Sequence, residues 1–63
     1  MFIHLTQENY PNFKIRIAID KILFYMQNPE GPGSVIAIVD GEPTNMLEDV
    51  VEIDSLISEA RKS

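Results

Sequence analysis

The chain has 63 residues, no cysteine, a single histidine and a formal net charge of −5. A chain this short buries only about 60% of its unfolded surface when it folds, so small domains usually add disulfides, a metal or a second chain. The composition excludes disulfides and, within one chain, a zinc site built from cysteine and histidine. Association with another chain therefore remains as the expected source of added stability.

The negative charge is concentrated in the C-terminal part of the sequence. Cations and carboxylates cancel over residues 1–39, whereas residues 40–63 hold seven carboxylates and two cations. Such a balance opposes binding to nucleic acid or to an anionic membrane surface. No run of about 18 apolar residues exists to span a membrane. The first residues lack the basic region of a signal peptide, so the sequence predicts cytoplasmic residence.

The first part of the chain predicts two strands. Residues 2–6 alternate in polarity, with Ile3 and Leu5 expected to point inward. Residues 7–12 are rich in turn formers and contain a proline. Residues 14–19 alternate isoleucines with the side chains of two cations and an alanine, and β-branched residues at period two are typical of a strand.

Two further strands, 22–27 and 34–39, are predicted after a bend or bulge at Asp20-Lys21. In the first, Ile22, Phe24 and Met26 should lie on one side, and Leu23 and Tyr25 on the other. In the second, Val35, Ala37 and Val39 alternate with Ile36 and Ile38. Strands that are apolar on both faces indicate a central position or a sheet covered twice. The intervening loop, residues 28–33, holds two prolines and two glycines.

A hairpin is predicted at Asp40-Gly41, since both residue types tolerate the positive φ of a type I′ turn. The return strand, residues 42–47, contains Pro43 and should lie at a sheet edge, because proline cannot donate a ladder hydrogen bond.

A helix is predicted over about residues 49–61. Asp49 can cap its N-terminus, and Glu52 follows at the spacing of a capping box. Asp54 is expected on the polar face, where its removal should be nearly silent. The apolar positions recur at helical spacing and form one stripe. These positions are Val50, Ile53, Leu56, Ile57 and Ala60.

The predicted fold class is α+β. Four to five strands form a small antiparallel sheet or a partly open barrel, closed by one C-terminal helix. Residues 1–63 are expected to make one β-rich domain.

The order of these signals resembles the small flagellar FlbD-like (swarming motility) proteins and similar short phage-encoded proteins. The resemblance covers roughly residues 3–57, and it implies an architecture without implying a catalytic residue. The loop Asn28–Gly33 is longer than in that family, and Pro43 is a second departure. The resemblance is carried by the Ile-His-Leu-Thr strand of residues 3–6, the asparagine turn after it, and segments 17–22, 34–38, 40–42 and 47–53.

No pattern positions a catalytic site. His4 could serve as a base for Ser34, Ser55 or Ser58, but no motif brings it to any of them, and a place on a strand facing solvent or a neighbouring chain is expected. We therefore predict a protein that is not an enzyme and that holds no cofactor.

Two charged sets have structural interpretations. A hairpin turn and a helix cap account for the acidic set better than a calcium site, because the spacing of a calcium-binding loop is absent. The basic set falls short of a nucleic-acid footprint, and pairing with carboxylates across strands is the expected use. The acidic set is Asp40, Glu42, Glu48 and Asp49; the basic set is Lys14, Arg16 and Lys21.

The doubly apolar strands suggest function. One helix covers one face of a sheet, so the second apolar face is either an interface or the inside of a small barrel. The interface candidates are Leu23 and Tyr25 together with Ile36 and Ile38, or with Val35, Ala37 and Val39 in their place.

The sequence thus predicts a small non-enzymatic protein–protein interaction or accessory module that self-associates and also binds an unknown protein partner. The alternative is a nucleic-acid-binding regulator of the small β-rich dimer type, since the distal half distantly resembles the LytTR-type DNA-binding sheet. The net charge disfavours that alternative.

Overall fold

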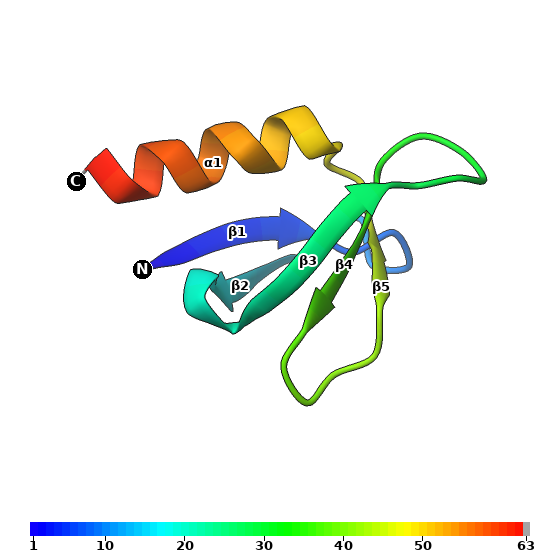
Figure 1. Cartoon of the computed structure of the whole chain (residues 1–63). Helices are drawn as coiled ribbons and strands as arrows, with labels where there is room; N and C mark the ends of the chain where they lie inside the picture. Colours follow the sequence, from blue (N-terminus) through cyan, green and yellow to red (C-terminus); the bar gives the residue numbers. More distant parts are fainter. Residues whose placement is uncertain (63) are drawn as a thin grey trace.

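The computed structural model describes residues 1–62 and confirms the α+β class. Five antiparallel strands form two small sheets, and one C-terminal helix packs against them (Figure 1). The elements are β1 (Phe2–Thr6), β2 (Lys14–Ala18), the 3₁₀ turn η1 (Ile19–Lys21), β3 (Ile22–Gln27), β4 (Ser34–Ile38), β5 (Thr44–Met46) and α1 (Val50–Lys62).

The first sheet is the hairpin of β1 and β2, in which Ile3 lies opposite Ile17 and Leu5 opposite Ile15. Ile3 and Leu5 are buried as the alternation predicts. The expected bend after the second strand is the single turn η1, whose Ile19 packs against the core.

The second sheet has the order β3-β4-β5, with Pro43 just before the edge strand β5. Pairing resumes only at Thr44, so the return strand is shorter than expected. The turn is also wider than a type I′ turn. Asp40 has a φ of 63°, whereas Gly41 is absent from the positive-φ positions of the described chain. Type I′ needs a positive φ at both central residues.

The two sheets are joined at one corner. Gln7 and Met46 form an isolated antiparallel bridge. The Leu47 amide donates to the Thr6 carbonyl at 2.9 Å, and the Glu8 amide donates to the Asn45 carbonyl at 3.1 Å. The strands therefore follow the order β2-β1-β5-β4-β3, in which β2 and β3 are the outer edges of the described part.

Gly33 is required where the loop enters β4. Its φ is 91°, a conformation that disfavours side chains. A Cβ at this position would lie 2.3 Å from the Met46 carbonyl oxygen, so the close approach of β5 also demands a glycine.

Helix α1 lies along β1 and contacts β3 (Figure 1). The Asp49 Oδ1 accepts the Glu52 amide at 2.8 Å, which confirms the predicted N-cap. Ile53 is fully buried in the core cluster with residues of both sheets, and Leu56, Ile57 and Ala60 pack against that cluster. No helix of residues 1–62 is long and apolar enough to cross a membrane.

Candidate interaction surface

A bulge in β3 decides which side chains face the core. Ile22 lies opposite Ile38, but Phe24 lies opposite Ala37, so Leu23 is an extra residue without a partner on β4. An extra residue reverses the alternation beyond it. Ile22 before the bulge and Tyr25 after it consequently pack against the same core.

Because of this reversal, most of the residues expected at the interface lie on the core side of the sheet. Ile36 is 2% exposed and belongs to the core cluster, and Ile38 and Tyr25 pack against that cluster. Of the four named interface candidates, only Leu23 is exposed on the surface, at 65%. The expectation that Phe24 shares a side with Ile22 is also wrong, because the bulge lies between them.

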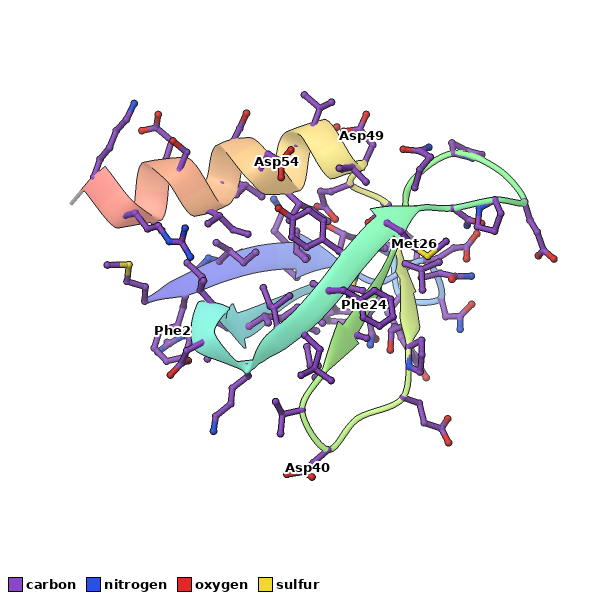
Figure 2. The ribbon with its side chains drawn as sticks, viewed as in Figure 1. Phe2, Phe24, Met26, Asp40, Asp49 and Asp54 are labelled. Carbon is purple, nitrogen blue, oxygen red and sulfur yellow. The ribbon has the colours of Figure 1, made fainter. Side chains whose placement is uncertain are left out.

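The side of the second sheet that is turned away from the core is apolar over β3 and β4. We call it the outer face. Phe24 and Met26 lie on it with exposures of 51% and 45%, and Figure 2 shows both on the near side of β3. Their partners across the ladder are Ala37 and Val35, which belonged to the alternative candidate set. Ala37 is buried yet lies outside the core cluster, as a small residue beneath larger neighbours would.

The free edge of β3 adds unpaired backbone groups beside the outer face. The Asn28 amide donates to the Gly33 carbonyl at 3.1 Å, which fixes the alternation of bonded pairs in the ladder. The amides and carbonyls of Phe24 and Met26 therefore point to β4, and those of Tyr25 and Gln27 point away from it. Within residues 1–62, β3 pairs with β4 alone, and the other edge of β3 is open.

The opposite edge, β2, is built differently. The Ile19 amide donates to the Met1 carbonyl at 3.0 Å, so the outward amides of β2 belong to Lys14, Arg16 and Ala18. The Arg16 guanidinium lies over the ring of Phe2, 4.4 Å from its centroid. Charged side chains at this edge discourage the addition of another strand.

Tyr25 ties the edge strand β3 to the helix. Its hydroxyl donates a hydrogen bond to the Asp54 carboxylate. This bond, together with desolvation and the negative charge of Asp54, raises the pKa of Tyr25, and Arg61 opposes the rise. Asp54 is exposed on the polar face of the helix, as expected, and the long tyrosine side chain reaches it there.

Two residues of the acidic set, Glu48 and Asp49, form hydrogen bonds that hold the fold together. The Thr6 amide and hydroxyl donate to the two carboxylate oxygens of Glu48 at 2.8 and 2.9 Å, and the buried Ser34 hydroxyl donates to the Glu48 carbonyl at 2.7 Å. These bonds join β1, β4 and the start of the helix, and nothing in the sequence motifs indicated them. Glu42 and Asp40 are exposed, with Asp40 at the tip of the hairpin (Figure 2).

An open groove of about 760 Å³ separates α1 from the outer side of the first hairpin. His4 is exposed in it, and no hydrogen bond of the described residues involves its imidazole. Of the serines considered with it, Ser55 lines the same groove, Ser34 is committed to Glu48, and Ser58 lies on the other side of the helix. In the part of the chain that the structure describes, no three metal-ligating side chains cluster.

Comparisons with family models, with curated proteins and with solved structures gave no match for this chain. The resemblance to the FlbD-like proteins stays a prediction.

Proposed function

We propose that this chain is a small non-enzymatic protein–protein interaction module that self-associates. The observation that carries the proposal is the uncovered outer face, where Phe24 and Met26 are half exposed beside Leu23. The helix covers the inner side of the sheets, so this face has no cover within residues 1–62. Contiguous exposed apolar patches in soluble domains mark interaction sites.

The size of the domain supports the same proposal. Six buried apolar side chains form the core cluster, and neither a disulfide nor a clustered metal site reinforces it in the described residues. Burial of the outer face against a second chain would stabilise the fold through mass action. The proposal includes cytoplasmic residence, where small domains fold without disulfides.

The proposal is tested by sedimentation velocity over a concentration series from micromolar upward. Self-association is expected, and Phe24→Ser should shift the chain toward the monomer of 7.2 kDa. Phe13→Ser is the matched control, because Phe13 is equally apolar and 69% exposed but lies in the loop before β2. A wild-type monomer throughout the series would contradict the proposal.

One observation favours the alternative, a nucleic-acid-binding regulator. His4 lies directly opposite Arg16 on the first hairpin, with Lys14 and Phe2 on the same two strands. The adjoining groove, however, is also lined by Glu48, Glu52 and Glu59. Carboxylates beside a small basic patch oppose phosphate binding. Submicromolar affinity for DNA or RNA in an anisotropy titration at physiological salt would support this alternative.

A further inference from the structure

We infer that two copies of the chain join through their β3 edges, in antiparallel register centred on Tyr25, to make one continuous six-stranded sheet. This inference rests on the proposed self-association and names its geometry. The partner is a second copy of the same chain, and the contact is backbone hydrogen bonding at the edge together with apolar contact on the outer face.

The edge of β3 has the chemistry of a pairing site. Tyr25 and Gln27 direct amides and carbonyls outward, and a partner strand satisfies such groups. The strand Ile22–Gln27 holds no charged residue and no proline. Proteins guard exposed edges with such residues, and β2 shows that device with Lys14 and Arg16.

The proposed self-association makes a second copy the occupant, and the charge distribution points to the β3 edge as the place where the copies meet. The chain has a net charge of −5, and self-association must avoid placing carboxylates against carboxylates. The side chains of the strand meet this condition, because Ile22–Gln27 are uncharged. The Asp54 carboxylate beside each central Tyr25 shares its hollow with the cations Arg61 and Lys62. Like charges directly opposite each other would destabilise an antiparallel pair.

The register follows from face and hydrogen-bond direction. A two-fold axis perpendicular to the sheet keeps outer side chains on one face, so Tyr25 can pair with Tyr25 of the second copy. Tyr25 already directs both of its backbone groups outward, which suits a bonded pair with its copy, and the outward Gln27 amide of one copy can donate to the Leu23 carbonyl of the other. Phe24 of each copy then lies opposite Met26 of the other, a favourable contact of sulfur with an aromatic ring. This centre leaves the bulge at Leu23 near the end of the paired segment.

The pairing is tested first with variants that guard the edge as β2 is guarded. Phe24→Lys with Met26→Lys should weaken dimerisation at least tenfold in sedimentation experiments. Phe13→Lys with Val51→Lys is the control, since it makes the same change of net charge at exposed apolar sites away from β3. Dimerisation that survives the first pair unchanged would overturn the edge geometry while leaving the proposed function standing.

A second variant separates the edge from the outer face. Gln27→Pro removes one outward amide, and proline is tolerated on an edge strand where its nitrogen faces solvent. It should weaken dimerisation, whereas Gln27→Ala should not. Equal dimerisation of the two variants would assign the contact to side chains alone and overturn the strand pairing.

Covalent trapping tests the register and also decides the matter if the lysine variant does not fold. The chain lacks cysteine, so Phe24→Cys with Met26→Cys should give a disulfide-linked dimer under mild oxidation. Lys14→Cys with Arg16→Cys has the same spacing on β2 and should remain uncrosslinked. A dimer in sedimentation without crosslinking at β3, or with preferential crosslinking at β2, would overturn the register. A wild-type chain that stays monomeric would instead contradict the proposed function itself.

Discussion

The two edge strands of the molecule, β2 and β3, face the same physical problem with different sequences. Each pairs on one side only within the described residues and leaves backbone groups open on the other. β2 reads Lys-Ile-Arg-Ile-Ala, and its two cations stand at the open edge. β3 reads Ile-Leu-Phe-Tyr-Met-Gln, and Leu23, Phe24 and Met26 are exposed along it.

The difference teaches that the two edges are not equivalent surfaces. An unguarded apolar edge is an aggregation hazard unless a partner covers it. The chain protects β2 with charge and places Arg16 over Phe2, which also shields an exposed aromatic ring. β3 has no such protection, and this contrast is the strongest reason to assign it a partner.

The largest effect is expected from a substitution in the core, because both edge strands depend on it. Ile53 is fully buried and contacts the core formed by both sheets. Ile53→Ala should lower the free energy of unfolding by about 2–5 kcal/mol, which is most of the stability that a domain of this size holds. Thermal melts should show a largely unfolded chain. Val51→Ala is the control, since Val51 is 71% exposed on the same helix; equal damage from both variants would contradict the observed helix orientation.

Much of the scaffold could be predicted from the sequence because its signals are local. Alternation placed Ile3 and Leu5 inward, and the predicted helix differs from Val50–Lys62 by about one residue at each end. The cap at Asp49 was predicted from its spacing to Glu52, and the hydrogen bond between them confirms it.

The outer face could not be predicted in full, since a bulge leaves no mark in an apolar run. Leu23 is as apolar as its neighbours, so nothing shows that it lacks a partner and shifts Tyr25 to the core side. The wide hairpin was missed for a different reason. The Asp40-Gly41 signal is local, but Pro43 prevents pairing until Thr44.

The second prediction makes β2 resemble β3. Lys14→Leu with Arg16→Leu removes the guarding charges, so the chain should have two unguarded edges and assemble beyond the dimer. Light scattering should show larger species that grow with concentration. Lys21→Leu with Lys62→Leu gives the same net charge away from the β2 edge. Growth of both variants to the same extent would attribute the effect to net charge and not to the edge.

A smaller effect is expected at the helix cap, which touches neither edge. Asp49→Ala should cost about 1 kcal/mol, because the Glu52 amide loses its acceptor. Asp49→Asn keeps an acceptor and should cost less. Chemical denaturation measures both. The dimer dissociation constant, measured where the variants remain folded, should stay unchanged; a cap variant that dissociates the dimer would show that edge variants report stability and not contact.

The smallest effect concerns the tether between β3 and the helix. The Tyr25 hydroxyl donates to the Asp54 carboxylate at an exposed site, so Asp54→Ala should cost about 0.5 kcal/mol. The sign of its pH dependence follows from the raised pKa of Tyr25. The folded chain holds the phenolic proton more tightly than the unfolded chain does. The contribution is therefore fully present below a pH of about 10 and is lost as the pH rises through the raised pKa.

The chain has two tyrosines, so replacing Tyr10 leaves Tyr25 as the one phenol that titrates. In a Tyr10→Phe background, tyrosinate absorbance reports Tyr25 alone, and Asp54→Ala should lower its titration midpoint. Asp54→Asn separates the causes: its amide oxygen can still accept the bond, but the negative charge is gone. The hydrogen bond is the largest cause of the raised pKa and the charge of Asp54 a smaller one, so the midpoint of Asp54→Asn should lie between the other two. Identical midpoints in all three chains would show that Tyr25 is not tethered to α1 in solution.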